Sequence, residues 1–543
     1  MDLNDQNEWW RHSVCYQVYV RSFADADGDG IGDLPGITSR LPYLRDLGVD
    51  SLWITPFYTS PQNDHGYDVA DYRDVDPLFG TLGDADELLA RAHDLGLRVI
   101  VDLVPNHTSD RHEWFQAALA AGPGSKERER YVFRDSTDGN PPNNWQSVFG
   151  GPAWTRVEAG PGERAQWYLH LFDSTQPDLN WRNPEVGDMF EDVLRFWLDR
   201  GVDGFRVDVA HGLVKDESLR DQVVDPDEEP SSIPEESTAG GVGASGDSMV
   251  ERHMRDEPMW DQPEVHDVYR RWHKVLAEYG GDRMTVAEAW TQTPESMARF
   301  VRDDEMNQAF NFSWLLAPWS AEAFSEVITG TLDAIEDVDA SPTWVLSNHD
   351  VVRHPTRYGG GATGLARARA AMLTMLALPG SSYLYQGEEL GLEQVDVGPE
   401  HRSDPSWFRT GEEGRDGCRV PIPWGGEDPS YGFGPSEAQP WLPQPVDWAP
   451  LTVAAQDADP DSTLSFYRAA LAARRKLALA AGDDVAMLDL GTDVLAFRRG
   501  VLTVVLNCGT EGVELPAGDI AAASGKLEGR LLGADTAVWL RSG

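Results

Sequence analysis

The chain has 543 residues, which suggests several domains or one large barrel with additions, and its hydrophobic content of 41% is enough for a large core. A formal net charge of −46 argues against nucleic acid or an anionic membrane as a partner. Residues 1–11 are polar and acidic, and the chain contains no run of about 18 apolar residues, so we expect neither a signal peptide nor a membrane span. The three cysteines are far apart, which excludes a disulfide framework and a zinc pattern. We therefore expect a cytoplasmic protein.

The first predicted strand, residues 14–20, leads into an acidic loop at residues 25–33. Alternate aspartates with intervening glycines form a compact set of oxygen ligands, which suits a hard cation such as Ca²⁺ or Mg²⁺. The loop is no EF-hand, because Gly36 stands where the bidentate glutamate would be. A charged surface turn is the alternative, although carboxylates this close would repel one another without a cation. The expected ligands are the carboxylates of Asp25, Asp27, Asp29 and Asp33 and the carbonyl of Ile31.

Strands and helices then alternate along most of the chain. The predicted helices span residues 37–47, 82–95, 186–200 and 464–479, and the predicted strands span residues 51–54, 97–102, 204–208, 284–287, 308–312, 343–346 and 382–385. Nearly all the strand residues are apolar, which is typical of parallel strands buried on both faces, and polar residues cluster just after each strand. This order predicts an α/β fold, a (β/α)₈ TIM barrel.

Two regions interrupt the barrel pattern, and a third follows it. Residues 107–176 are rich in glycine, proline, asparagine and tryptophan, which indicates a small domain inserted after the third strand. The polar, acidic residues 216–263 predict a long loop after the fourth strand that caps the site. The end of the chain alternates apolar and polar residues with glycine turns, which predicts an all-β domain at residues 481–543. The barrel would thus be formed by residues 1–106 and 177–480.

Three carboxylates stand just beyond the ends of three predicted strands. Asp208 follows Arg206 by two positions, so both side chains point to the same face of a strand, and the arginine would keep the aspartate ionised. A fixed, ionised aspartate is suited to be a covalent nucleophile for acetal chemistry, although an ordinary core ion pair explains this stretch equally well. Glu288 and Asp350 follow two further strands, and a barrel would bring all three to one face.

Several blocks of residues occur in an order that resembles glycoside hydrolase family 13, the α-amylase family. They are residues 102–107 (Asp-Leu-Val-Pro-Asn-His), 176–181 (Gln-Pro-Asp-Leu-Asn-Trp), 204–211, 286–290 and 347–350. The acidic loop, the second block and residues 419–424 (Arg-Val-Pro-Ile-Pro-Trp) make the chain most similar to the α-glucosidase and oligo-1,6-glucosidase branch. The last segment departs from the usual Arg-Thr-Pro-Met-Gln-Trp of that branch, which weakens any inference about the acceptor.

The resemblance implies roles for particular residues. Asp208 would be the nucleophile, Glu288 the general acid and then base, and Asp350 the group that stabilises the transition state. The other implied substrate contacts are His107 and His349, which would hydrogen-bond sugar hydroxyls; Arg206, which would keep the nucleophile charged; Tyr67, which would stack on glucose; and Asp64 with Arg419, which would pair at the bottom of the pocket. Phe149 and Phe172 would either wall the pocket or belong to the core.

The resemblance implies an exo-acting retaining α-glucosidase that acts on maltose and short α-glucosides. A glucosyl transferase or isomerase on the same scaffold, such as a trehalose synthase or a sucrose-acting enzyme, is one alternative, and an oligo-1,6-glucosidase is another. A non-catalytic binding or transporter-accessory protein is disfavoured, because it would lack the three acids that this chain has. We expect a small α-glucoside or maltooligosaccharide as the partner and no organic cofactor.

Overall fold

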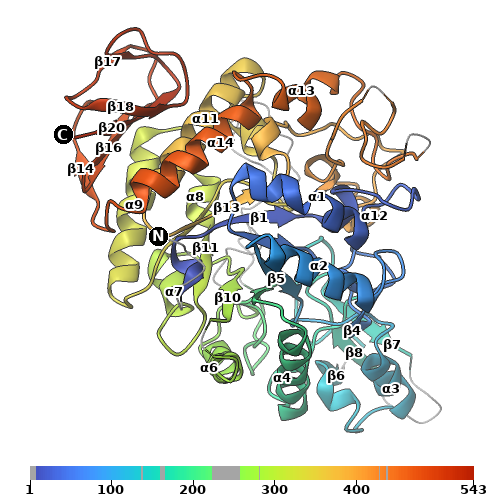
Figure 1. The fold of residues 1–543 in the computed structure, drawn as a ribbon. Coiled ribbons are helices and arrows are strands. Elements are labelled where there is room, and N and C mark those ends of the chain that lie inside the picture. Colours follow the sequence, from blue (N-terminus) through green and yellow to red (C-terminus); the bar gives the residue numbers. More distant parts are fainter. Residues whose placement is uncertain are drawn as a thin grey trace.

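The computed structural model describes residues 8–135, 139–158, 165–222, 257–280, 282–426, 428–435 and 438–542. Its centre is a closed barrel of parallel strands (Figure 1). In chain order these are β1 (Val14–Val18), β2 (Ser51–Ile54), β5 (Arg98–Leu103), β9 (Gly204–Val207), β10 (Met284–Ala287), β11 (Gln308–Asn311), β12 (Thr343–Val345) and β13 (Ser381–Tyr385). The predicted (β/α)₈ barrel is confirmed, and every predicted strand overlaps an observed one.

Helices surround this barrel. The principal ones are α1 (Leu34–Leu47), α2 (Leu82–Asp94), α4 (Pro184–Asp199), α6 (Val265–Ala277), α7 (Pro294–Arg299), α9 (Ala321–Glu336), α11 (Gly361–Ala377) and α14 (Thr463–Ala473). Local sequence fixes where several of them begin. Thr81 and Asp84 form a capping box at the start of α2, and the side chain of Asn183 accepts a hydrogen bond from the backbone at the start of α4.

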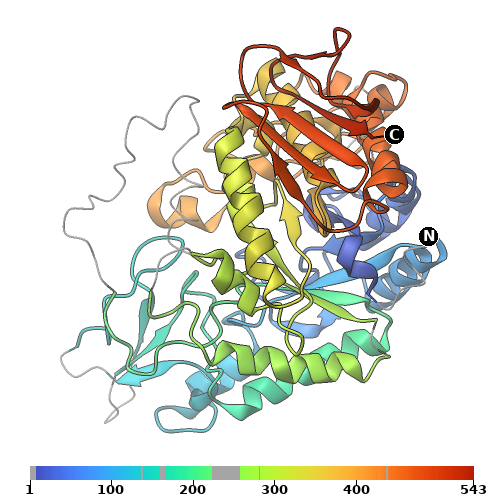
Figure 2. The same cartoon turned by 90° about the vertical axis from the view of Figure 1, so that its left-hand side faces the viewer.

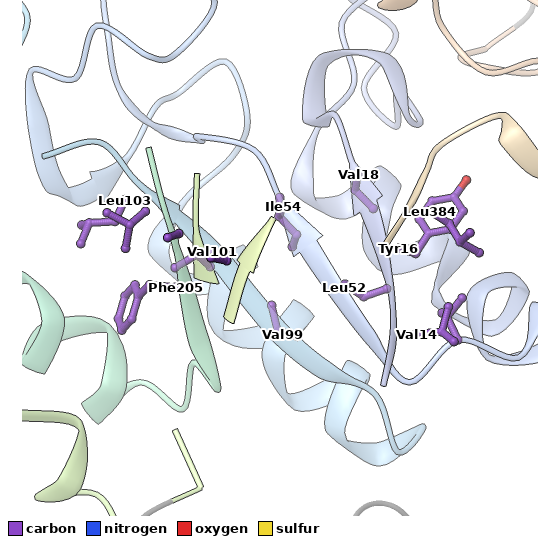
Figure 3. Close-up of a cluster of buried hydrophobic side chains, with 14 of the residues drawn as sticks. Val14, Tyr16, Val18, Leu52, Ile54, Val99, Val101, Leu103, Phe205 and Leu384 are labelled. Atoms are coloured by element: carbon purple, nitrogen blue, oxygen red, sulfur yellow. The ribbon is translucent and has the colours of Figure 1, made fainter. Parts of the chain in front are cut away.

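The strands bury both faces, and the two faces have different neighbours. Alternate strand residues point outward to the helices and join the main apolar core, and Figure 3 shows Val14, Tyr16, Val18, Leu52, Ile54, Val99, Val101, Leu103, Phe205 and Leu384 among them. The intervening residues fill the barrel interior, including Cys15, Trp53, Ile100, Val286, Phe310, Val345 and Tyr383. This alternation follows from the period of two in a strand and leaves the ends of the strands for polar chemistry.

The chain between β5 and β9 departs from the barrel, as the sequence predicts. It contains α3 (Glu113–Ala121) and a three-stranded antiparallel sheet with the order β6 (Phe133–Asp135), β8 (Gln166–Leu169) and β7 (Trp154–Val157). The apolar cluster of this region includes Phe149 and Phe172, and Val209, the residue after Asp208, packs into it. A short ladder of β3 (Tyr58–Thr59) and β4 (Asp71–Val75) follows β2.

The C-terminal region forms an antiparallel sheet in the order β14 (Ala486–Leu488), β15 (Val494–Arg499), β16 (Leu502–Asn507), β20 (Thr536–Arg541) and β18 (Asp519–Ala523), with a small ladder of β17 (Val513–Glu514) and β19 (Leu531–Leu532). The predicted C-terminal all-β unit is thus confirmed. Trp539 of β20 donates from Nε1 to the carbonyl of Leu373 in α11 at 3.0 Å, which attaches the sheet to the barrel helices. Figure 2 shows this sheet and the inserted region at opposite ends of the molecule.

Long connections lie on the side of the barrel where the strands end. The connection after β13 carries the short helices α12 (Pro405–Thr410) and α13 (Val453–Asp457), and α8 (Phe312–Leu316) and α10 (His354–Arg357) follow β11 and β12. Of the loop predicted at residues 216–263, residues 223–256 lie outside the described part. Its two described ends lie together, because the backbone N–H of Asp216 donates to the carbonyl of Pro258 at 2.8 Å.

Candidate active site

The ends of the barrel strands bring the three predicted carboxylates together. Asp208 follows β9 directly, Glu288 follows β10 directly, and Asp350 lies in the loop after β12. They line one pocket, and its remaining lining residues are Asp64, Tyr67, His107, Phe172, Val209, Trp290, His349 and Arg415. Five of these eight, the first four and His349, were predicted as substrate contacts.

Arg206 lies behind the nucleophile candidate and joins it to two other carboxylates. Its Nη1 lies 2.7 Å from Oδ1 of Asp208 and 2.8 Å from Oδ1 of Asp102, and its Nη2 lies 2.7 Å from Oε2 of Glu288. The arginine is 1% exposed, and its guanidinium also lies 4.9 Å from the ring centre of Trp53 inside the barrel. These charged hydrogen bonds fix the direction of both Asp208 and Glu288.

One guanidinium faces three buried carboxylates, and this affects their protonation. Burial raises the pKa of Asp208 well above its ordinary value; Arg206 opposes this rise, while Glu288 and Asp102 add to it. Burial raises the pKa of Asp102 to about 6, again with Arg206 opposing. The crowding of three buried carboxylates around one cation therefore disfavours the fully ionised state of the cluster.

Glu288 is held by its neighbours as well as by Arg206. The backbone N–H of Val209 donates to Oε2 of Glu288 at 2.9 Å, and Nε1 of Trp290 donates to Oε1 at 3.1 Å. Val209 adopts a φ of 47°, which is unusual for a β-branched residue and turns the chain sharply just after the nucleophile candidate. The strained turn thus places the N–H of Val209 on Glu288 while Asp208 stays on Arg206.

Asp350 has cationic partners of its own. Its Oδ1 lies 3.2 Å from Nη1 of Arg415 and 3.0 Å from Nη2 of Arg419. Burial acts to raise the pKa of Asp350, but the charges of Arg415 and Arg419 oppose it, and the pKa lies below the ordinary range. The two arginines therefore favour the ionised form of Asp350.

Both predicted histidines lie at the pocket as neutral hydrogen-bonding groups. Burial lowers the pKa of His107 to about 4 and the pKa of His349 well below its ordinary value. Nε2 of Gln17 donates to Nδ1 of His349 at 2.7 Å, which leaves the proton of His349 on Nε2, 2.6 Å from the hydroxyl of Tyr67. The Tyr67 ring also stacks on His349, with ring centres 5.3 Å apart.

The prediction that Asp64 pairs with Arg419 is wrong, because the partner of Asp64 is a different arginine. Asp64 pairs with Arg415, whose Nη2 lies 2.7 Å from Oδ1 of Asp64. Arg419 is fully buried one layer further back, where its Nε donates to the carbonyl of His349 at 2.8 Å and its Nη2 binds Asp350. Both arginines lie in the irregular loop after β13, four positions apart. Arg415, Val209 and Trp290 are the lining residues that were not predicted as substrate contacts.

The two phenylalanines of the inserted region occupy different layers. Phe172 lines the pocket, with its ring centre 5.0 Å from that of His107. Phe149 lies behind it, edge-on to Phe172 with ring centres 5.6 Å apart and with the guanidinium of Arg415 4.9 Å from its ring centre. Of the two alternatives left open by the sequence, the pocket wall holds for Phe172, and Phe149 supports that wall from the core.

The acidic loop between β1 and α1 lies apart from this pocket. Oxygens of Asp25, Asp27 and Asp29 all lie within 4.8 Å of one another. Asp33 has a different position, because it caps α1: its Oδ1 accepts from the N–H of Gly36 at 2.6 Å and its Oδ2 from the N–H of Ala26 at 2.9 Å. The pattern of aspartate followed by Leu34 and Pro35 is a helix-start signal that could have revealed this cap.

Comparisons with known proteins agree with this geometry. Residues 17–482 match the family described as alpha amylase, catalytic domain. The chain is 41% identical over 505 residues to a protein named probable alpha-glucosidase from Rhizobium meliloti (strain 1021), covering 92% of this chain and 88% of the relative. It is 34% identical to an oligo-1,6-glucosidase from Parageobacillus thermoglucosidasius, covering 86% and 84% of the two chains.

Solved structures show the same fold over nearly the whole length. An alpha-glucosyl transfer enzyme, XgtA, superposes with a TM-score of 0.86 at 37% identity and covers 99% of this chain and 100% of its own. The trehalulose synthase MutB superposes with a TM-score of 0.84 at 29% identity and covers 98% and 100%. The fold, the carboxylate pocket and these matches define a glycoside hydrolase of the α-amylase family, glycoside hydrolase family 13. Within that family the chain belongs to the α-glucosidase and oligo-1,6-glucosidase branch.

Among the helices of the described residues, none combines the length and the apolar character that crossing a bilayer requires.

Proposed function

We propose that the protein is an exo-acting retaining α-glucosidase that releases glucose from the non-reducing end of maltose and other short α-glucosides. The observation that carries this proposal is the buried pair of Asp64 and Arg415, which lies at the pocket. Charged groups placed there would bind the outer hydroxyls of a terminal glucose and leave no path for the chain to continue beyond it. A relative named Maltase 1 from Drosophila virilis, 36% identical over 527 residues, supports maltose as a substrate.

The proposed chemistry is a double displacement. A carboxylate oxygen of Asp208 attacks the anomeric carbon while Glu288 gives its proton to the departing glycosidic oxygen, which leaves a glucosyl ester on Asp208. Glu288 then takes a proton from water, the water oxygen attacks the same carbon, and the ester bond to Asp208 breaks. Retaining enzymes need the two carboxyl groups about 5–5.5 Å apart. The attachment of both groups to the same guanidinium, that of Arg206, supports such a short separation.

The remaining groups have supporting roles in this proposal. Asp350, kept ionised by Arg415 and Arg419, would stabilise the positive charge that develops on the sugar ring. His107 and His349, both neutral, would exchange hydrogen bonds with sugar hydroxyls without adding charge near that cation. Tyr67 would stack against the glucose ring, and Phe172 would form the wall on the side of the inserted region.

Glucosyl transfer is the second candidate, and the structural neighbours favour it. The similar structures include an alpha-glucosyl transfer enzyme and a trehalulose synthase. A transferase would form the same glucosyl ester and pass it to a sugar hydroxyl in place of water. The two candidates therefore share Asp208 and Glu288, and they differ only in the acceptor that reaches the ester.

Initial rates and products on maltose, isomaltose, trehalose, sucrose and soluble starch test the proposal. We expect fast release of glucose from maltose, slower release from isomaltose and poor activity on starch. Products would be followed by chromatography at low and high sugar concentration. Trisaccharides or isomerised disaccharides as the main products at low sugar concentration would favour the transferase. A fast fall in starch viscosity with little free glucose would contradict an exo-acting pocket.

We propose further that the loop at residues 25–33 binds Ca²⁺ or Mg²⁺ as a structural ion. The oxygens of Asp25, Asp27 and Asp29 converge, and none of the three has an ion pair with a cationic side chain among the described residues. Burial raises the pKa of Asp29 above its ordinary value, and the neighbouring Asp27 and Asp25 add to that rise. A hard cation would relieve this repulsion. Asp33 and the carbonyl of Ile31 would complete the ligand set; Asp33, like Asp25, also accepts hydrogen bonds from backbone N–H groups.

A further inference from the structure

Trp441 lies outside the pocket but is bonded to the layer directly behind it. It belongs to the irregular connection between β13 and α14 and is half-buried. Its backbone N–H donates to the carbonyl of Gly30, in the loop after β1, at 2.9 Å. The guanidinium of Arg21 lies 4.7 Å from the centre of its ring. Two separate segments of the loop after β1 thus hold Trp441, one through its backbone and one through its ring.

A first path leads from the indole N–H to Asp350. Nε1 of Trp441 donates to Oγ of Ser22 at 3.0 Å, and that hydroxyl donates to the backbone carbonyl of Arg419. The side chain of Arg419 then donates from Nη2 to Asp350 at 3.0 Å and from Nε to the carbonyl of His349 at 2.8 Å. Each of these residues is linked to the next by a hydrogen bond. Loss of the indole N–H would therefore loosen the backbone that carries Arg419.

A second path leads from the indole ring to Asp64. The ring of His65 packs edge-on against Trp441, with ring centres 5.1 Å apart. His65 adopts a φ of 50°, an unusual backbone conformation, and its Nδ1 lies 3.2 Å from Nη1 of Arg419. The indole therefore braces a strained residue next to Asp64, the partner of Arg415 in the pocket.

We propose that Trp441 is a positioning residue for the glucose pocket. It holds Asp64, through His65, and Asp350, through Ser22 and Arg419, in the geometry that binds the terminal sugar. The inference rests on the proposed α-glucosidase function, because it assigns those two aspartates to substrate. Trp441 is not among the residues that line the pocket, so its effect on the sugar must pass through Asp64 and Asp350.

The experiment compares Trp441→Phe and Trp441→Ala with Trp319→Phe and Trp319→Ala. Trp319 is a matched control, because it is also half-buried, carries the guanidinium of Arg367 5.5 Å from its ring centre and donates from Nε1 to Asp535 at 2.9 Å, far from the pocket. The KM and kcat for maltose, the melting temperature and the affinity for glucose by calorimetry would be measured for all four variants and the parent.

We expect Trp441→Ala to raise the KM for maltose by about tenfold and to weaken glucose binding to a similar degree, since fixed partners of the sugar lose their support. Trp441→Phe keeps the ring against Arg21 and His65 and loses only the indole N–H, so its KM should lie between those of the parent and Trp441→Ala. The Trp319 variants should lose thermal stability without a change in KM. An unchanged KM in Trp441→Ala, or an equal KM rise in Trp319→Ala, would overturn the proposal.

Failure of the proposed function would be recognised separately. A parent enzyme that binds glucose but does not cleave maltose would refute the α-glucosidase assignment, and the calorimetric comparison of Trp441 with Trp319 would still decide the positioning role. If Trp441→Ala does not fold, the Trp441→Phe variant alone decides it, because a merely structural tryptophan would leave KM unchanged when phenylalanine replaces it.

Discussion

Asp64 and Arg415 form a buried ion pair, with Nη2 of Arg415 2.7 Å from Oδ1 of Asp64. The same arginine donates from Nε to Asp404 at 2.6 Å, and its Nη1 lies 3.2 Å from Asp350. One guanidinium thus connects the loops that follow β2, β12 and β13. Because the aspartates it binds are buried with it, the arginine sets both the charge and the shape of this end of the pocket.

Arg415→Ala should lower kcat/KM for maltose by about a hundredfold or more, because the glucose loses a charged partner and three buried aspartates lose their shared cation. Both KM and kcat should change, since the proposed role of Asp350 is to stabilise the transition state. Arg409→Ala is the matched control. Arg409 lies in the same connection after β13, its Nη1 lies 2.9 Å from Oδ1 of Asp173, and it does not line the pocket. Equal losses in the two variants would mean that Arg415 merely stabilises the loop.

Asp208→Asn should lower kcat by several orders of magnitude, because the amide cannot form the glucosyl ester. Its melting temperature should stay close to that of the parent. Arg206 would keep Asp102 and Glu288 as partners, and the variant removes one of three crowded carboxylates. Rate measurements would be paired with mass spectrometry to exclude deamidation. Retention of more than about a tenth of the parent activity would contradict the nucleophile assignment.

Much of the fold and of the catalytic centre could be predicted from sequence, because each part is local to a strand. Apolar runs mark the strands, and the residue that follows a strand must lie at the barrel end, so Asp208 and Glu288 were found without knowledge of the loops. Arg415 was not predicted, because its position is not fixed by the end of a strand. Arg415 and Arg419 lie in the same irregular connection, and only its path in space decides which one reaches Asp64.

The limits of local reasoning are also visible at the acidic loop. Alternate aspartates at residues 25–33 predict one set of oxygen ligands, and the structure gives Asp33 a second role as the cap of α1 through the N–H of Gly36. That second role depends on where the helix begins. Trp441 offered no signal at all, since its partners Gly30, Ser22 and His65 are distant in the sequence.

Removal of a bound cation should lower the melting temperature by several degrees, because an ion that binds the folded loop stabilises the folded state by mass action. The measurement compares thermal unfolding before and after chelation, with metal content checked by elemental analysis. The Asp27→Asn variant should melt at about the temperature of the chelated parent, and chelation should not lower its melting temperature further. An unchanged melting temperature after confirmed loss of metal would argue against a structural ion at this loop.

Glu388→Gln should make the stability of the protein less dependent on pH. Burial raises the pKa of Glu388 to about 8, with Glu389 adding to the rise and Arg353 opposing it. The folded state therefore keeps a proton that the unfolded state has released, so this group's contribution to stability is fully present below the unfolded pKa and is lost as pH rises through about 8. The parent's melting temperature should fall more steeply between about pH 5.5 and pH 8 than that of Glu388→Gln. Glu326→Gln, on the exposed face of α9, should behave like the parent.

The choice between linkages should depend on Val209. Its side chain lines the pocket beside Asp208 and packs into the apolar cluster of the inserted region, and its backbone N–H holds Glu288 at 2.9 Å. In the branch that this chain resembles, valine at this position goes more often with α-1,6 cleavage. The residues around it, Ala210-His211 and Ala289-Trp290, depart from the typical α-1,6 enzymes. We therefore expect the parent to cleave maltose faster than isomaltose and to retain some activity on isomaltose.

Val209→Ala tests the role of this side chain directly. Removal of two methyl groups widens the pocket next to the bond that is cleaved. The ratio of kcat/KM for maltose to kcat/KM for isomaltose should therefore change several-fold and come closer to one. A small apolar group in a binding site contributes about 1–3 kcal/mol to such discrimination. The backbone turn should persist, because Glu288 still accepts the N–H of residue 209. Val214→Ala is the control, since Val214 is buried in the same loop but lies outside the carboxylate pocket. A parent enzyme that turns over isomaltose faster than maltose would reverse the predicted preference, and an unchanged ratio in Val209→Ala would remove Val209 from the determinants of linkage.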